Sequence, residues 1–170
     1  MTKIITNTQL SDLPDIFGMF DAAIDYQKLK GYPVWPDYDK QVLEDDITDN
    51  RQFKILRDQA LACIFTICYD DAIVWRDKNK TPAIYLHRVV THPKHKGHNL
   101  FQDVLDWTIQ KCKSENIDFI RMDTWADNPN LIEYYYTFGF EFVEYFQNPS
   151  DDSLPIQQRG NRVILLEYKV

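Results

Sequence analysis

The most constraining feature of this sequence is an apolar strand that stops at a proline and is followed by a short basic loop and an amphipathic helix. Residues 83–91 are rich in β-branched and apolar side chains, which favours a strand. Pro93 stops this strand because proline cannot donate to a central ladder. In residues 99–115 apolar side chains recur at helical spacing. A helix directly after such a strand predicts a crossover to a parallel neighbour, and therefore a sheet through the middle of the chain.

Similar patterns predict the other elements. We expect further strands at 3–6, 52–57, 60–69, 119–124, 141–146 and 162–170. We expect further helices at 11–30, 38–48 and 128–138, the first capped by Ser11 with Pro14 in its first turn and the last closed by Gly139. Segments 70–82 and 147–161 are polar and are expected to be loops. This order combines parallel crossovers with flanking antiparallel hairpins, which indicates a mixed sheet of the α/β class.

Length and charge narrow the function classes. A chain of 170 residues with 44% hydrophobic residues can bury a core, so we expect a single domain over residues 1–170. The chain has 19 Lys and Arg against 26 Asp and Glu, a net charge of −7. It therefore lacks the general basic character that binds nucleic acids or anionic membranes, and we expect neither as a partner. The longest apolar run, residues 60–69, is about half as long as a membrane-spanning helix.

The cysteines and the N-terminus favour a cytoplasmic location. Cys63 and Cys68 are five residues apart in a predicted strand, so they point to opposite faces and are poorly placed to form a disulfide. With Cys112 they make an odd count of three, which we interpret as buried thiols in a reducing compartment. Residues 1–6 have no apolar signal core.

The start of the helix at 99–115 is a candidate anion site. A helix start presents unpaired N–H groups and a partial positive charge. Lys94, His95, Lys96 and His98 precede it, so backbone and side chains could hold a phosphate together. A solvated basic turn without a ligand is the alternative. These histidines have no carboxylate or thiolate partner beside them in the sequence, so we expect no metal.

Two acid–base candidates lie further along the chain. Tyr134, Tyr135 and Tyr136 cannot all face one way on a helix, so one can be buried while another points into a cleft. A tyrosine hydroxyl there could donate a proton to a leaving thiolate, or all three rings could simply pack. Asp123 ends a strand, where ligands gather in open α/β sheets. It could act as a base or bind a cation, and a structural hydrogen bond is the alternative.

Together these segments resemble the GNAT superfamily of acyl-CoA-dependent N-acetyltransferases. Residues 86–99, the following helix and residues 121–140 carry the resemblance, and its most specific part is Asn128, six residues, Tyr135, three residues and Gly139-Phe140. The resemblance implies a three-layer fold with a central mixed, mostly antiparallel, twisted sheet of about seven strands and about four flanking helices. It also implies acetyl-CoA as co-substrate and no metal.

In this family the strand before the proline diverges from its neighbour and pairs with the pantetheine arm of the cofactor. That role would fall to Val89, Val90 and Thr91, with a backbone N–H of Val89 or Val90 holding the oxyanion. Asn128 would make a further cofactor contact.

The pyrophosphate loop departs from the family pattern. The family usually has Arg or Gln, two residues, Gly, one residue, and Gly or Ala, where this chain has Lys96, Asn99 and Phe101. Lysine keeps the charge but loses the bidentate fork, and asparagine tolerates a left-handed backbone. Phe101 puts a large side chain where the backbone should approach closely, which predicts weaker or displaced binding. The other implied contacts are Gly97, His98 and Leu100.

The resemblance assigns the general acid to Tyr135, which would protonate the CoA thiolate. In ribosomal-protein alanine acetyltransferases, which the same stretch resembles, the base is a carboxylate five residues before the asparagine, here Asp123. The acceptor is expected to be a primary amine of a small molecule or peptide. We expect its pocket to include Tyr26, Tyr32, Trp35, Tyr38, His87 and Trp125, and at its other end residues 147–157. Nearby carboxylates could add charge contacts to an ammonium group, namely Asp21, Asp25, Asp37 and Asp39. The alternative is that Trp35 and its neighbours cap the core and that the aspartates around them only make the surface soluble.

A function without turnover stays open as the alternative to an enzyme, either as a module that binds the cofactor or as one that binds a protein. The altered loop at 96–101 favours a module that binds CoA or an acyl-CoA, or a protein partner, without turnover, whereas Asn128 and Tyr135 favour catalysis. The loop at 147–161 is long enough for a lid or a homodimer contact, and disorder is the alternative.

Overall fold

One sheet runs through the whole molecule. The computed structural model describes residues 2–170, and Met1 lies outside the described residues. The sheet has seven strands in the order β1-β2-β3-β4-β5-β7-β6. The strands are β1 (Lys3–Asn7), β2 (Gln52–Arg57), β3 (Ala60–Cys68), β4 (Ile84–Thr91), β5 (Phe119–Trp125), β6 (Glu141–Gln147) and β7 (Arg162–Lys169). Each predicted strand is therefore confirmed, with ends that differ from the prediction by a residue at most.

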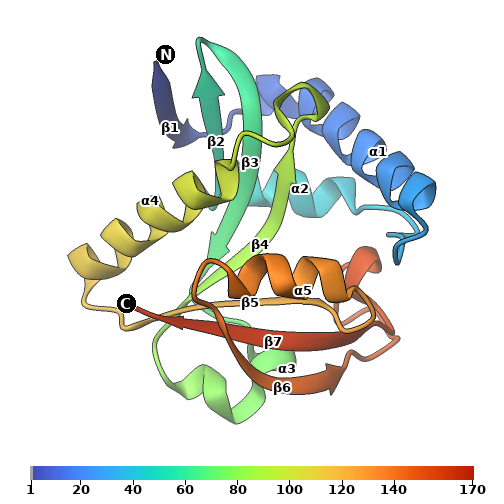
Figure 1. Ribbon diagram of the computed structural model, residues 1–170, viewed down its shortest axis with the longest axis vertical. Helices are drawn as coiled ribbons and strands as arrows, with labels where there is room; N and C mark the ends of the chain where they lie inside the picture. Colours follow the sequence, from blue (N-terminus) through green and yellow to red (C-terminus); the bar gives the residue numbers. More distant parts are fainter. Residues whose placement is uncertain (1) are drawn as a thin grey trace.

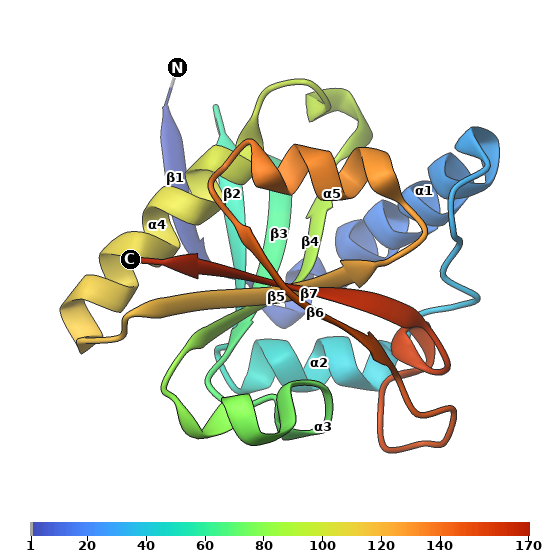
Figure 2. The same ribbon diagram turned by 60° about the horizontal axis from the view of Figure 1, so that its bottom comes forward.

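The sheet is mixed and mostly antiparallel, as predicted. Among the described strands, only β4 and β5 pair in parallel, and the helix between them makes the predicted crossover. The sheet is strongly twisted, so that β5, β7 and β6 run across the direction of β2 and β3 (Figures 1 and 2). This twist places the parallel pair at the centre of the molecule.

Helices cover both faces of the sheet and make three layers. They are α1 (Leu13–Lys30), α2 (Lys40–Thr48), α3 (Ala72–Trp75), α4 (Leu100–Glu115) and α5 (Pro129–Tyr136). Successive residues of β7 alternate between the faces: Ile164 and Leu166 share a core with α4 and α5, whereas Val163 and Leu165 share one with α3. A third core joins α1 and α2 to the sheet. The three-layer prediction is confirmed, with five α-helices where about four were expected.

Two local predictions were wrong. Ser11 does not cap α1, because it lies inside a preceding 3₁₀ turn, Leu10–Asp12, and the Asp12 carboxylate accepts a hydrogen bond from the Gln9 N–H at 2.7 Å. The polar segment 70–82 is not only a loop. It contains α3, which is too short to show helical periodicity and which buries Trp75 completely against Tyr85.

The three cysteines are free thiols in or near the core. Cys63 and Cys112 are buried, Cys68 is only partly so, and all three are free of disulfides. Within residues 2–170, none of the helices has both the length and the apolar character that crossing a membrane requires.

A bulge interrupts β4 where it passes β3. Ile64 faces Val90 and Thr66 faces His87, so two residues, Arg88 and Val89, lie opposite Phe65 alone. Arg88 adopts φ +49°, a left-handed conformation that is unusual for a residue with a side chain. Such strain persists only where surrounding contacts hold it.

A buried carboxylate makes the contacts that stabilise the left-handed backbone at Arg88. Asp46 on α2 is 1% exposed and accepts a hydrogen bond from Arg88 Nε at 2.9 Å. It also accepts one from Thr66 Oγ1 at 3.2 Å and pairs with Arg51. All three partners are donors, so the charge of Asp46 is compensated. The ion pair between Arg88 and Asp46 therefore ties α2 to the bulge in β4.

β4 and β5 diverge before the chain of β4 reaches the bulge. They pair at Ile84 with Ile120 and at Tyr85 with Arg121, and the described residues form no further ladder between these strands. The side of β4 that faces β5 is thus left without strand partners from Leu86 onward. Backbone donors and acceptors in such a position need other partners.

Removing the Asp46 carboxylate should destabilise the protein strongly. Asp46→Ala would leave the Arg88 side chain, which is 9% exposed, without its counter-charge. Loss of one partner of a buried ion pair costs about 3–5 kcal/mol. We expect urea denaturation to show a loss of this size. The control Asp45→Ala removes an exposed carboxylate from the same helix and should change the free energy of unfolding little. Equal effects of the two variants would contradict this role.

Candidate functional site

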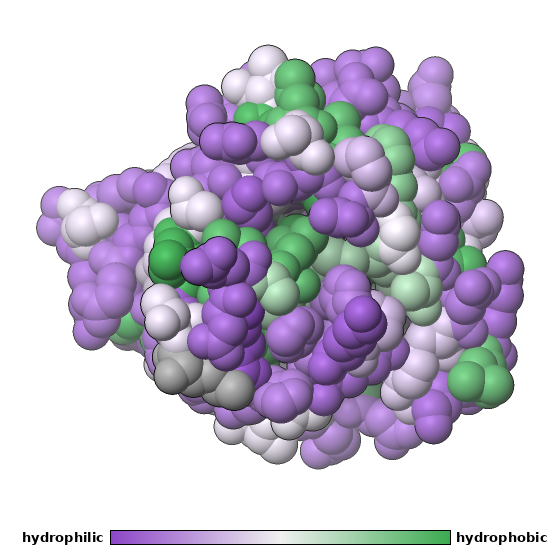
Figure 3. Space-filling view, turned by 90° about the horizontal axis from the view of Figure 1, so that it is seen from above, coloured by the Kyte–Doolittle hydropathy of each residue, from purple (hydrophilic) through white to green (hydrophobic). Residues whose placement is uncertain are grey.

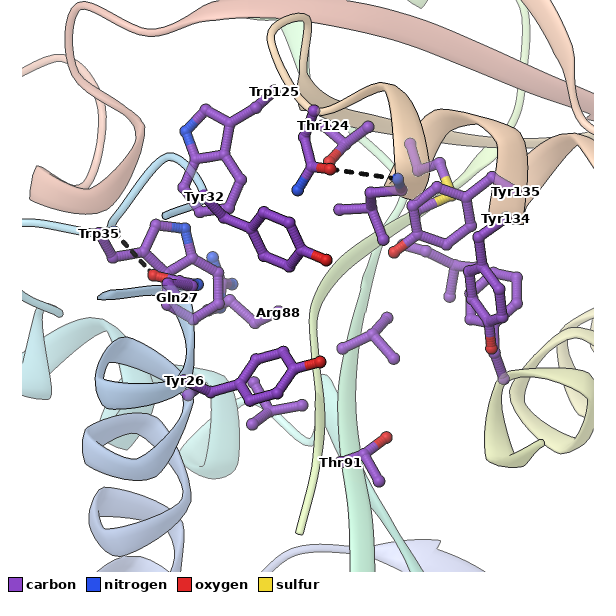
Figure 4. Close-up of a pocket in the computed structure, with 18 of the residues that line it drawn as sticks. Tyr26, Gln27, Tyr32, Trp35, Arg88, Thr91, Thr124, Trp125, Tyr134 and Tyr135 are labelled. Atoms are coloured by element: carbon purple, nitrogen blue, oxygen red, sulfur yellow. Dashed lines mark hydrogen bonds between the residues drawn. The ribbon is translucent and has the colours of Figure 1, made fainter. Parts of the chain in front are cut away.

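A cavity of about 690 Å³ lies where β4 and β5 diverge. Its walls come from α1, β4, the loop after β4, the starts of α4 and α5, the end of β5 and the loop before β7. Figure 3 shows hydrophobic side chains gathered around a hollow in the molecular surface, with hydrophilic side chains around its rim. The close-up in Figure 4 shows aromatic side chains entering it from both sides.

One end of the cavity combines an unpaired strand edge with a helix start. Val89, Val90 and Thr91 line it, and the first residues of α4 follow. Asn99, the residue before α4, makes no side-chain cap, so the first turn of the helix keeps free N–H groups. This end can bind a chain of amides along the strand and an anion at the helix.

The loop between strand and helix has the backbone that such an anion site needs. Gly97 and Asn99 both have positive φ, +80° and +53°. The tolerance of asparagine for this conformation was the predicted reason that it can replace glycine. The Phe101 ring does not block the loop. It is 5% exposed and packs edge-on against Tyr135 and Phe138, with centroids 5.0 and 4.9 Å away.

Lys96 crosses from this loop to α1. Its Nζ lies 3.0 Å from the centre of the Tyr26 ring, a cation–π contact. Burial and the nearby Lys30 lower the pKa of Lys96. Among the described residues, His95, His98 and Arg88 add further basic groups to the cavity wall. This end of the cavity is therefore suited to an anion although the whole chain is acidic.

Tyr135 lies in the last turn of α5, and Asn128 caps the start of the same helix. The Asn128 side chain caps that helix by accepting a hydrogen bond from the Leu131 N–H at 3.2 Å. Tyr135 is 8% exposed, and its hydroxyl points toward the centre of the cavity (Figure 4). Burial raises the pKa of Tyr135, so the hydroxyl keeps its proton at neutral pH. Tyr134 also lines the cavity, whereas Tyr136 does not.

Aromatic and amide side chains form the opposite wall. Trp35 and Trp125 pack with ring centroids 5.8 Å apart, and Tyr26 and Tyr32 direct their hydroxyls inward (Figure 4). Gln27 fixes the Trp35 segment by accepting a hydrogen bond from the Trp35 N–H at 2.9 Å. The loop before β7 adds three amides, Gln157, Gln158 and Asn161. This wall can contact an apolar body with a few polar groups.

Tyr38 is not part of the cavity. It is 7% exposed in the core of α1 and α2, and its hydroxyl donates to Asp21 at 2.9 Å. Asp39 is also occupied elsewhere, as the cap of α2. Asp25 and Asp37 do not line the cavity either. The structure thus corrects the expectation that Tyr38 and this group of aspartates surround the acceptor.

Asp123 is the one carboxylate among the described residues that lines the cavity. His87 lines the cavity beside it, on β4, and Asp71 lies behind His87, with 3.4 Å between His87 Nε2 and Asp71 Oδ2. Burial raises the pKa of Asp123 to about 6, and nearby His87 counteracts part of that rise. A carboxyl with this pKa is mostly ionised at pH 7 and can accept a proton.

Two features of the site were missed in the sequence. Asp71 lies in a segment interpreted as a loop, and nothing in the pattern ties it to His87. Arg88 lies in the strand that the pattern does predict, but its left-handed backbone has no sequence signal. Of residues 147–157, which were expected at the other end of the pocket, Gln157 lines the cavity, and Gln158 and Asn161 just beyond that stretch line it too. Like Tyr38 and its group of aspartates, Lys94 does not line the cavity. The other single residues predicted for the site do line it, namely Tyr26, Tyr32, Trp35, His87, Val89, Val90, Thr91, His95, Lys96, Gly97, His98, Asn99, Leu100, Phe101, Asp123, Trp125, Asn128 and Tyr135.

Comparisons with known proteins agree with this architecture. Residues 20–140 match the model of the Acetyltransferase (GNAT) family. A protein of Bacillus subtilis strain 168 named "Uncharacterized N-acetyltransferase YesJ" is 26% identical over 140 residues, covering 78% of each chain. A GNAT-family acetyltransferase structure from Listeria monocytogenes has a TM-score of 0.80 at 19% identity, covering 99% of this chain and 95% of that one. The structure of yncA from Salmonella typhimurium with acetyl-CoA has a TM-score of 0.67 at 14% identity, covering 99% and 94%.

The raised pKa of Asp123 predicts a pH-dependent gain in stability when the carboxylate is removed. Burial raises this pKa from 3.8 to about 6, so the folded protein binds more protons than the unfolded chain between these values. Stability therefore falls as pH rises through that window. Asp123→Asn should be more stable than the wild type at pH 7.5, by as much as about 3 kcal/mol, and equal to it at about pH 4.

Urea denaturation at the two pH values measures this difference. Asp127→Asn, which alters an exposed aspartate in the turn after β5, should show no such dependence. A variant Asp123→Asn that gains nothing at pH 7.5 would show that the carboxylate is not desolvated.

Proposed function

This chain belongs to the Acetyltransferase (GNAT) family, and we propose that it transfers an acetyl group from acetyl-CoA to the primary amine of a small molecule or peptide. The observation that carries the proposal is the unpaired edge of β4, which faces the buried hydroxyl of Tyr135 across one cavity. An edge without strand partners can hold the amides of an extended ligand, and the hydroxyl can donate a proton to a leaving group beside it.

The residues at the loop end of the cavity suit acetyl-CoA. Val89 to Thr91 would pair with the pantetheine arm, and the N–H groups at the start of α4 would bind the pyrophosphate. Lys96 would supply a cation there, which requires that its ammonium leave the Tyr26 ring. The thioester supplies an activated acetyl group, and a backbone N–H at Val89 or Val90 would stabilise the oxyanion that forms on it.

The acceptor would approach from the aromatic wall. An alkylamine with a pKa near 10.4 is almost wholly protonated at pH 7, so a base must remove a proton before attack. Asp123 would accept that proton, and Tyr135 would give its own to the CoA thiolate. With Asp123 as the one cavity carboxylate among the described residues, the wall favours an amine with one positive charge and an apolar body over a polyamine.

A second candidate function is binding without turnover. The departures Lys96, Asn99 and Phe101 from the usual pyrophosphate loop favour it. Against it, the Asn99 backbone and the inward Phe101 ring leave the helix start open. Tyr135 is buried with its hydroxyl in the cavity, which pure cofactor binding does not require.

Acetyl-CoA should stabilise the folded protein. A ligand that binds only the folded state adds about 2.7 kcal/mol at a hundredfold excess over its Kd. We expect a clear rise in melting temperature with acetyl-CoA, measured by thermal shift against CoA and a ligand-free control. No rise at millimolar ligand would contradict both candidate functions that use the cofactor.

Tyr135→Phe separates catalysis from binding. Removing the hydroxyl should lower kcat by about 10²–10⁴-fold, the usual contribution of a general acid, because the thiolate then leaves unprotonated. The acetyl-CoA thermal shift should stay close to that of the wild type, since the ring still packs on Phe101. Tyr136→Phe is the matched control, because that ring lies outside the cavity. Undiminished turnover in Tyr135→Phe, measured as free thiol released with a panel of primary amines, would remove Tyr135 from the mechanism.

A further inference from the structure

Asp71, His87 and Asp123 form a compact group beside the cavity. One oxygen or nitrogen atom from each lies within 4.8 Å of the corresponding atoms of the other two. His87 Nε2 lies 3.4 Å from Asp71 Oδ2, and both side chains are 10% exposed. Asp71 Oδ2 is buried and makes no hydrogen bond among the described residues. A buried carboxylate oxygen in this state needs a positive or proton-bearing partner, and the imidazole is the group that faces it.

The fold brings the three groups together from separate segments. His87 and Asp123 each lie two residues beyond the last parallel pair, Tyr85 with Arg121, and therefore face the same side of the sheet. Asp71 lies at the start of α3, where its backbone N–H donates to Asn79 Oδ1 at 2.8 Å and its carbonyl accepts from Trp75 N–H at 2.9 Å. Both backbone groups are thus anchored, which holds the carboxylate against His87.

Charged groups on several elements act on the carboxyl of Asp123. His87 favours the ionised carboxyl, whereas Asp71 disfavours it. Arg88 also faces it from β4, but its guanidinium is engaged with Asp46 on α2. Of the described groups, Asp123 and His87 line the cavity, and Asp71 does not. An acceptor ammonium can therefore reach Asp123 and His87, while Asp71 lies outside the cavity and acts through its charge on both of them.

We propose that Asp71, His87 and Asp123 work as one proton-accepting unit, in which Asp123 takes a proton from the acceptor ammonium, His87 takes it from Asp123, and Asp71 stabilises the imidazolium. The proposal rests on the proposed acetyltransferase function. Asp123 and His87 are close enough for transfer directly or through one water. Asp71 is a positioning residue that orients and stabilises the imidazole, as in other carboxylate–histidine pairs.

The proton balance of acetyl transfer explains the use of such a unit. An ammonium acceptor loses two protons when it becomes an amide, and the leaving thiolate takes up one. Tyr135 would deliver that one and must be reprotonated. One proton is therefore released to solvent in each turnover. A second acceptor behind Asp123 returns its carboxylate to the ionised form while the amine is still bound.

Carbon-13 NMR of the Asp123 carboxyl tests the unit without any need for activity. Because Asp71 disfavours the ionised form, Asp71→Asn should lower the pKa of Asp123 below its value of about 6. His87→Gln should shift it in the opposite direction. Asp123→Asn identifies the resonance. Asp70→Asn, which changes the exposed neighbour of Asp71, should leave the titration unchanged. A carboxyl that titrates identically in Asp71→Asn and His87→Gln overturns the proposal.

Kinetics then test the role in catalysis. With 2-phenylethylamine as the probe, chosen for the aromatic wall, the wild type should lose kcat/KM as pH falls through about 6. Asp71→Asn should move this limb to lower pH and reduce the plateau kcat about tenfold or more. A merely structural effect would lower the plateau and leave the limb in place, and that result overturns the relay. Should Asp71→Asn fail to fold, His87→Gln carries the same test with the opposite shift.

Two further outcomes are distinguishable. Two carboxylates and a histidine can also bind a divalent cation. Activity that EDTA removes and Zn²⁺ restores would overturn the relay. If no amine in the panel is acetylated while the NMR shifts occur as expected, the proposed function fails and takes the catalytic role of the unit with it, whereas the coupled titration stands.

Discussion

The left-handed backbone at Arg88 is the constraint on which the rest of this structure depends. It inserts one extra residue into β4 opposite Phe65. The pairing of β4 with β5 ends at Tyr85, and the bulge lies further along, inside the stretch of β4 that has no partner on this side. The conformation is unfavourable by itself, and a buried carboxylate on a different helix, Asp46, compensates for it. The ion pair with Asp46 therefore fixes Arg88, which lines the cavity, although Asp46 itself does not line it.

The divergence also separates two kinds of chemistry. On the loop side, the start of α4 and Lys96 form a basic environment for an anion. On the side of Trp35 and Trp125, the wall is aromatic, and Asp123 is the one carboxylate among the described residues. The free edge of β4 connects both sides. The proposed reaction between an anionic donor and a cationic acceptor thus has a suitable environment for each.

Sequence reasoning predicted the parts of this arrangement that depend on local pattern. Every strand has a run of β-branched or apolar residues, and Pro93 marks the end of β4. Sequence reasoning failed where contacts between distant segments determine the local structure. Trp75 belongs to a helix of a single turn that is stabilised by packing, and Tyr38 is buried by α1 and α2 rather than exposed to the cavity. Asp71 meets His87 only because α3 folds back under the sheet.

Burial raises the question of whether Tyr135 can still act as an acid. Its pKa is raised, which makes proton loss harder than for an exposed tyrosine. The same interior acts on thiols, however, and burial raises the pKa of nearby Cys63 to about 12. A CoA thiolate released into this environment would be a stronger base than in water for the same reason. In the proposed reaction, desolvation would raise the pKa of both partners, so proton transfer from Tyr135 to the thiolate would stay feasible while water is excluded. A thiolate that reached solvent would lose this shared rise in pKa, so the proposed role requires a hydroxyl that lies deep beside the unpaired strand edge, as that of Tyr135 does, and not at the rim.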